Sequence, residues 1–213
     1  MEYIVIILVA FGASMLTFFS GFGLGTMLTP VFMIFFPPEF AVAATAMVHF
    51  LNNIFKLILV GKHAVKSVII SFGLPAIVGA YFGALALGKL AHSDTILHIG
   101  PIETNFLNVV MAILIFVFSL MELLPRLKNL EISKKFLIPG GVMSGFFGGL
   151  SGHQGALRSA FLVKLGLSKS QFVASGVVIA CLVDTIRIST YAMFFDFAVL
   201  EESLGLIGLA TLS

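Results

Sequence analysis

The chain has 213 residues, of which 59% are hydrophobic and only 10% are charged, and its mean hydropathy is +1.13. A soluble domain carries charge on roughly a quarter of its residues, so this composition excludes a water-soluble globular protein. The formal net charge of +2 does not indicate a nucleic-acid partner, because most of the basic residues fall in loops between apolar segments.

Long apolar stretches cover most of the sequence. They lie at residues 3–36, 40–60, 67–90, 105–124, 136–163, 171–194 and 197–213. A helix needs about 20 apolar residues to cross a bilayer, and most of these stretches are long enough. Their hydrophobicity is continuous and does not alternate, which predicts helices and not barrel strands. The expected fold is an all-α integral membrane protein in contact with lipid.

The first stretch is too long and too rich in glycine for one straight span. Gly21, Gly23 and Gly25 lie in its middle, and Pro30 follows. This pattern predicts a hairpin of two short helices that are broken at the glycines. Thr26 and Thr29 flank the predicted turn, and their hydroxyls are candidate substrate contacts.

The second stretch carries one polar stripe. His49, Asn52, Asn53 and Lys56 have the spacing i, i+3, i+4 and i+7, so they share a helix face that should meet a cavity or another helix. The stripe could contact a substrate. Alternatively, His49 is a hydrogen-bonded packing residue and Lys56 extends to the membrane surface. The spacing has no metal-binding signature, and we expect neither a metal nor a cofactor.

The charges of the loops predict an orientation. The basic loops hold Lys62, Lys66, Arg126, Lys128, Lys134, Lys135, Lys164 and Lys169, and we assign them to the cytoplasm. The other loops are acidic or balanced, with Glu39, Lys89, Asp94, Glu103, Asp196, Glu201 and Glu202. With this assignment the amino terminus lies outside. We read it as retained, because its first residues lack the positive flank of a secretory signal.

Residues 136–163 must enter and leave the membrane on the cytoplasmic side if this orientation is correct. The stretch contains Gly145, Gly148, Gly149, Gly152 and Gly155, which predicts a second broken hairpin. His153 and Gln154 stand in its turn and are candidate substrate contacts.

Arg158 is the first candidate for binding an anion. It follows the second glycine turn, where the N-terminus of an interrupted helix would direct free N–H groups toward an anion. A guanidinium adds two-pronged hydrogen bonding that suits an oxyanion. The alternative is that Arg158 extends to the cytoplasmic surface, since Lys164 is only six residues away.

Asp184 and Arg187 are three residues apart on a predicted helix, so they share a face. We expect them to form an ion pair. Proton coupling through Asp184 is the alternative. Cys181, the single cysteine, excludes an internal disulfide and is expected to be a small core residue.

The two hairpins match at a fixed shift of 131 residues, which carries Ser20-Gly21 onto Ser151-Gly152 and Asn53 onto Asp184. We therefore predict one membrane domain of two repeats, at residues 1–128 and 132–213. Segments 40–60 and 171–194 would run in opposite directions, as in transporters with inverted repeats. The second repeat lacks a partner for segment 105–124, so we expect it to be incomplete.

Glycines four residues apart suggest where predicted helices pack closely. Gly79-x-x-x-Gly83 and Gly141-x-x-x-Gly145 are expected to mark close helix packing. By contrast, the spacing of Gly21, Gly23 and Gly25 is not a dinucleotide fingerprint, because no strand of a βαβ unit precedes it.

Several segments, taken in order, resemble the sulfite exporter TauE/SafE family, which belongs to the 4-toluene sulfonate uptake permeases. They are Ser20-Gly-Phe-Gly-Leu-Gly-Thr-Met-Leu-Thr-Pro30, Pro37-Pro-Glu-Phe-Ala-Val-Ala-Ala-Thr45 and Gly73-Leu-Pro-Ala-Ile-Val-Gly-Ala-Tyr-Phe-Gly83. The resemblance implies a prokaryotic cytoplasmic-membrane permease with duplicated halves that handles sulfite or sulfonates. The second glycine turn departs from the family pattern at Gly152–Phe161, which leaves the substrate open.

The hypothesis is a secondary transporter for a small sulfur-containing anion, with Arg158 holding the anion and no enzymatic activity. The rival is a non-transporting assembly factor or the remnant of a permease. A homo-oligomer is compatible with either.

Overall fold

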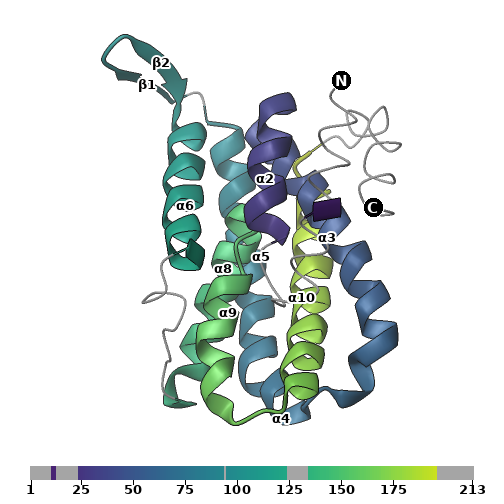
Figure 1. The fold of residues 1–213 in the computed structure, drawn as a ribbon. Coiled ribbons are helices and arrows are strands. Elements are labelled where there is room, and N and C mark those ends of the chain that lie inside the picture. Colours follow the sequence, from purple (N-terminus) through teal and green to yellow (C-terminus); the bar gives the residue numbers. More distant parts are fainter. Residues whose placement is uncertain (1–10, 13–23, 94, 124–133, 196–213) are drawn as a thin grey trace.

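The computed structural model describes residues 11–12, 24–93, 95–123 and 134–195 (Figure 1). Most of the first predicted hairpin, including Gly21 and Gly23, lies outside the described residues. So do Arg126, Lys128 and the last apolar stretch at 197–213.

Helices make up most of the described chain. They are α2 (Leu24–Phe35), α3 (Pro38–Val60), α4 (Lys66–Val68), α5 (Leu74–Ala91), α6 (Phe106–Leu123), α8 (Leu137–Ser151), α9 (Gly155–Leu162) and α10 (Lys169–Tyr191). Short 3₁₀ turns lie at Gly61–His63, Lys134–Phe136 and Val163–Leu165, and a π-helical turn at Ile69–Gly73 joins α4 to α5. The predicted all-α architecture is confirmed.

Within the described residues, four continuous helical segments are long and apolar enough to cross a membrane. They are Pro38–His63, Lys66–Ala91, Phe106–Leu123 and Lys169–Tyr191. They coincide with the stretches predicted at 40–60, 67–90, 105–124 and 171–194. Local sequence sets where two of them begin, since Pro38 starts α3 and a capping box of Ser168 and Gln171 starts α10.

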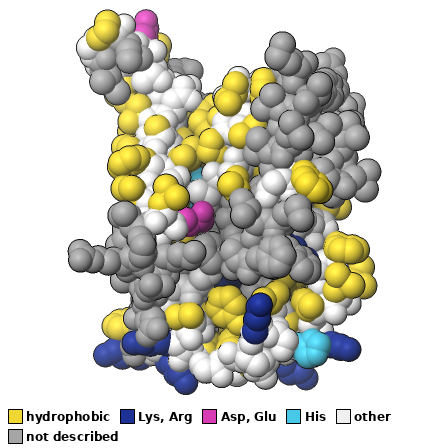
Figure 2. Space-filling view, in the orientation of Figure 1, with side chains coloured by type: hydrophobic (Ala, Val, Ile, Leu, Met, Phe, Trp, Pro, Cys, Tyr) yellow, Lys and Arg dark blue, Asp and Glu magenta, His cyan; other side chains and the backbone are white. Residues whose placement is uncertain are grey.

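The outer surface of the bundle is apolar. Phe55, Ile58, Ile70 and Phe116 are all more than 60% exposed, and Figure 2 shows apolar side chains over much of the visible face. Side chains of this kind would be unfavourable in water but suit contact with lipid chains. The chain is a multi-pass membrane protein.

A short β-hairpin was not predicted by the sequence analysis. Strands β1 (Ile96–Ile99) and β2 (Ile102–Asn105) pair antiparallel between α5 and α6. Gly100 in the turn has φ +60°, a conformation that glycine adopts readily. The hairpin projects beyond the ends of the helices (Figure 1).

Helices α5 and α8 pack closely through glycine. A Cβ atom added to Gly79 or Gly83 would collide with the backbone of α8, and one added to Gly141 or Gly145 would collide with backbone at Phe72 or Ala76. The predicted role of these glycines in close helix packing is confirmed. Without side chains at these positions, the two backbones come near enough for dispersion contacts.

Basic side chains gather at one end of the molecule. Lys62, Lys66, Lys134, Lys135, Lys164 and Lys169 are all exposed, and they belong to the turns and helix ends around α4 in Figure 1. Figure 2 shows most of the visible Lys and Arg side chains along this lower edge. The loops that the sequence analysis grouped by charge therefore lie on one side of the bundle.

Helices α3 and α10 lie side by side and run in opposite directions (Figure 1). Phe40 contacts Phe195 at one end, His49 contacts Asp184 further along, and the N–H of Val65 binds Ser175 near the other end. The opposite directions predicted for these two segments are confirmed, whereas the inverted repeat as a whole stays a prediction.

Gly145→Ala should destabilise the protein. The new methyl group would meet the backbone of Ala76, which cannot move aside without shifting α5, and overpacking of this kind costs about 1–3 kcal/mol. Gly73→Ala is the matched control, because its Cβ would meet only side chains, with Ile179 Cγ1 at 3.3 Å. Thermal melting of both variants in detergent measures the difference, and equal melting temperatures would contradict close α5–α8 packing.

Candidate functional site

The turn between α8 and α9 interrupts a helical hairpin inside the bundle. Helix α8 starts at the basic end, stops at Ser151 and is followed by Gly152 with φ +85°, after which α9 returns toward the basic end (Figure 1). With 15 residues, α8 is about 22 Å long, shorter than a hydrocarbon layer of about 30 Å. The predicted broken hairpin at 136–163 is confirmed, and Gly155 is the first residue of α9.

The start of α2 meets this turn. A Cβ added to Gly25 would lie 2.7 Å from the carbonyl oxygen of Gly152, so the two backbones approach each other where only glycine fits. Gly25 and Gly152 belong to the two predicted glycine turns. Within the described residues, the two turns therefore come together.

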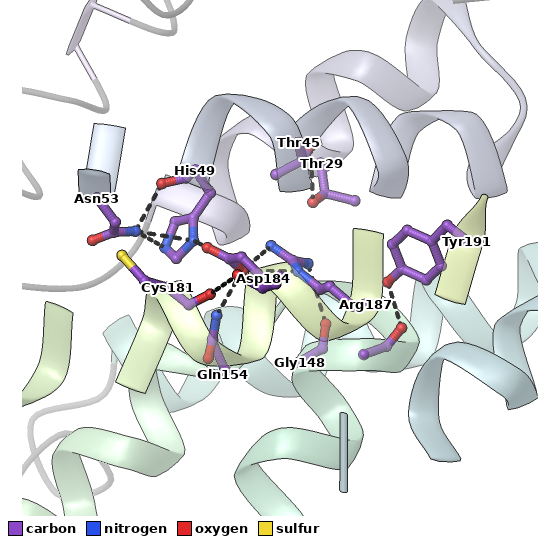
Figure 3. Close-up of polar contacts among 12 residues, drawn as sticks. Thr29, Thr45, His49, Asn53, Gly148, Gln154, Cys181, Asp184, Arg187 and Tyr191 are labelled. Atoms are coloured by element: carbon purple, nitrogen blue, oxygen red, sulfur yellow. Dashed lines mark hydrogen bonds and ion pairs between the residues drawn. The ribbon is translucent and has the colours of Figure 1, made fainter. Parts of the chain in front are cut away.

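Asp184 is the centre of a buried polar network beside the turn (Figure 3). Its Oδ1 accepts hydrogen bonds from Arg187 Nε at 2.9 Å and from Gln154 Nε2 at 3.1 Å, and Arg187 Nη2 lies 2.8 Å away. Its Oδ2 lies 2.6 Å from His49 Nδ1. The predicted pairing of Asp184 with Arg187 is confirmed, and proton coupling stays a prediction.

Arg187 and Tyr191 also satisfy the carbonyl groups at the end of α8. Arg187 Nη1 donates to the Gly148 carbonyl at 3.2 Å, and the Tyr191 hydroxyl donates to the Gly149 carbonyl. A positive charge at a helix C-terminus is favourable, because the carbonyl groups there carry partial negative charge. The sequence analysis did not identify Tyr191 as part of the network. The signal in the sequence was a tyrosine hydroxyl on an apolar helix.

The polar stripe of α3 faces α10 and the network. Asn53 is buried and donates to the His49 carbonyl at 2.8 Å, and its amide also contacts the His49 ring. Asn52 and Lys56 are half-buried. The predicted stripe is thus an interhelical face, with His49 hydrogen-bonded to a carboxylate.

The two threonines after the first glycine turn bind other helices. Thr26 donates to Glu122 on α6 at 2.7 Å, and Thr29 donates to Thr45 on α3 at 3.3 Å. These bonds attach the start of α2 to its neighbours. Contact of either hydroxyl with a substrate stays a prediction.

Arg158 points into the bundle from the first turns of α9. Only 5% of its surface is exposed, so the alternative in which it extends to the cytoplasmic surface is wrong. Its guanidinium packs against Gly176 of α10 and interacts electrostatically with Asp184. Its Nη1 has no hydrogen-bond partner within the described part of the chain.

Two more buried side chains of the turn have an unpartnered atom, again counting only described residues. They are His153, at Nε2, and Gln154, at Oε1. His153 stacks on Phe118 of α6 with ring centroids 5.3 Å apart, and its Nδ1 lies 3.1 Å from Ser151 Oγ. Because unsatisfied polar atoms are costly in a buried site, the three such atoms on His153, Gln154 and Arg158 make the turn and the start of α9 a candidate site for a polar ligand.

Asp184→Asn should lower stability sharply, because it leaves the buried charge of Arg187 without its counter-ion; loss of one partner of a buried pair costs about 3–5 kcal/mol. Adding Arg187→Gln removes the stranded charge, so the double variant should be less destabilised than the two single effects combined. Thermal melting of the wild type and the three variants measures this coupling. Strict additivity would show that the two side chains do not stabilise each other.

Comparison with known proteins places the chain in a family. The model of the family described as "Sulfite exporter TauE/SafE" matches residues 6–212, which is nearly the whole chain. Neither the curated proteins nor the solved structures give a match. The chain belongs to the TauE/SafE sulfite exporter family and is a membrane transporter for a small anion, not an enzyme.

Proposed function

We propose that the protein carries a small sulfur-containing oxyanion, such as sulfite or an organosulfonate, and that Arg158 holds this anion beside the α8–α9 turn. The observation that carries the proposal is that Nη1 of the buried Arg158 has no hydrogen-bond partner in the described part of the chain. Insertion of an arginine at the middle of a membrane helix costs roughly 2.5–3.5 kcal/mol. An anion would offset that cost by accepting the free hydrogen bond.

The other arginine of the network already has its partners. Arg187 binds Asp184 and the Gly148 carbonyl. Its charge and these donors are therefore already paired within the protein. Arg158 interacts with Asp184 electrostatically but makes no hydrogen bond to it among the described residues. This difference between the two arginines supports Arg158 as the residue that binds the substrate.

The position of the turn supports transport through the site. Helices α8 and α9 enter and leave at the basic end and stop partway through the bundle, and Gly25 brings the start of α2 against Gly152. In transporters with inverted repeats, broken helices of this kind meet at a site near the bilayer midplane. We assign the basic end to the cytoplasm, and the amino terminus to the outside, by the bias of Lys and Arg toward cytoplasmic loops.

Arg158→Ala should reduce uptake of radiolabelled sulfite into proteoliposomes by about 10- to 100-fold, the range expected for loss of a hydrogen bond to a charged group. Arg158→Lys should fall in between, because it keeps the charge but loses the planar fork. Lys66→Ala removes one exposed positive charge far from the turn and is the matched control. Full flux in a correctly folded Arg158→Ala variant would exclude Arg158 from the site.

Cysteine labelling tests the orientation. With Cys181, the chain's single cysteine, replaced by serine, new cysteines at the exposed positions Lys66 and Glu103 would report on the two ends of the bundle. A membrane-impermeant thiol reagent added to intact cells should label Glu103→Cys and not Lys66→Cys, and inside-out vesicles should give the reverse. The opposite pattern would invert the assigned orientation.

A further inference from the structure

The amide of Gln154 has only one orientation that fits its surroundings. Its Nε2 donates to Asp184 Oδ1 at 3.1 Å, and a carboxylate paired with an arginine can only accept a hydrogen bond. The nitrogen must therefore face Asp184, and the oxygen must face away. That oxygen, Oε1, has no partner in the described chain, although only 1% of the residue is exposed.

Neighbouring atoms hold the Gln154 side chain in place. A Cβ added to Gly148 would lie 2.9 Å from Gln154 Cβ and 3.6 Å from its Cδ, so the side chain packs directly on the α8 backbone. The Ser144 hydroxyl donates to the Gln154 carbonyl at 3.0 Å and fixes the backbone as well. The site therefore presents a fixed hydrogen-bond acceptor.

Gln154 and Arg158 belong to the same turn of helix. The N–H of Arg158 bonds to the Gln154 carbonyl at 3.1 Å, and residues four apart on a helix are neighbours on one face. Both side chains also contact α10, Gln154 at Asp184 and Arg158 at Gly176, about two helical turns away. A ligand that reached both side chains would meet Nη1 of Arg158 and Oε1 of Gln154, neither of which has a partner among the described residues.

The buried charges indicate the valence of the ligand. Among the described residues, the buried side chains that carry a formal charge are Arg158, Asp184 and Arg187. When His49, whose Nδ1 lies 2.6 Å from Asp184 Oδ2, is neutral, two positive charges and one negative charge leave an excess of one positive charge in a region of low dielectric constant. One negative charge neutralises the site, whereas a dianion would leave an uncompensated charge buried.

We propose that the site selects a monovalent oxyanion that carries its own hydrogen-bond donor, of which hydrogensulfite is an example, and that Gln154 Oε1 accepts this hydrogen. A sulfonate with only carbon substituents would leave Oε1 unsatisfied, and fully deprotonated sulfite or sulfate would lack the hydrogen. This inference rests on the proposed function, because it assumes that Arg158 binds the anion. Gln154 is then a specificity-determining residue.

Two anions of matched shape separate the contributions of charge and hydrogen bonding. Sulfamate and methanesulfonate are both monoanions with three sulfonyl oxygens, but sulfamate has an N–H donor where methanesulfonate has a methyl group. Each is added as a competitor of radiolabelled sulfite uptake into proteoliposomes. Sulfamate should inhibit the wild type at about tenfold lower concentration, the factor for one hydrogen bond to a buried group.

Gln154→Met keeps the length of the side chain but removes the acceptor. In this variant the two competitors should inhibit at nearly equal concentrations, because sulfamate loses its advantage while Arg158 still binds both. Lys66→Ala should keep the tenfold preference of the wild type.

The outcomes distinguish the inference from the proposed function. If the wild type takes up sulfite but sulfamate inhibits no better than methanesulfonate, or not at all, the inference is overturned and transport of sulfur oxyanions stands. A preference that persists unchanged in Gln154→Met also overturns it. If the wild type takes up no sulfite, the proposed function fails and the inference falls with it. Should Gln154→Met not fold, the wild-type comparison alone decides.

Discussion

The buried ion pair of Asp184 and Arg187 is the interaction on which the rest of the site depends. Arg187 donates to the Gly148 carbonyl and so binds the end of α8 to α10, while Asp184 contacts His49 on α3 and Gln154 in the turn. One carboxylate therefore connects three parts of the chain that are far apart in sequence. In a lipid environment no water can replace these partners, so we expect the turn to shift when the pair is broken.

The pairing of Asp184 with Arg187 bears on which buried polar atoms nearby could bind a ligand. Asp184 is occupied by Arg187, His49 and Gln154, and Arg158 is buried nearby with a nitrogen that has no partner among the described residues. The same network orients Gln154 so that its oxygen has none there either. A structural interaction thus prepares one donor and one acceptor, and membership of the TauE/SafE sulfite exporter family supplies the class of molecule expected to use them.

Glycine has two different roles in this arrangement. In α5 and α8 it allows two helices to pack backbone to backbone, as at Gly79 and Gly145, and this forms a rigid support for the hairpin. At Gly152 it allows a positive φ that ends α8 inside the bundle, and at Gly25 it allows α2 to approach that turn. Close packing stabilises the fold, whereas the turn carries the polar atoms that we propose contact a substrate.

The sequence by itself determined the features that depend on local pattern. Continuous hydrophobicity set the four membrane-length helices, glycine spacing predicted the second broken hairpin, and the basic loops identified one end of the bundle. Only the tertiary structure decided whether Arg158 is buried or exposed, which of its nitrogens lacks a partner among the described residues, and that Tyr191 binds the end of α8. The reason is physical: hydrophobic periodicity is a property of neighbouring residues, but a hydrogen bond in the membrane depends on which distant helices pack together.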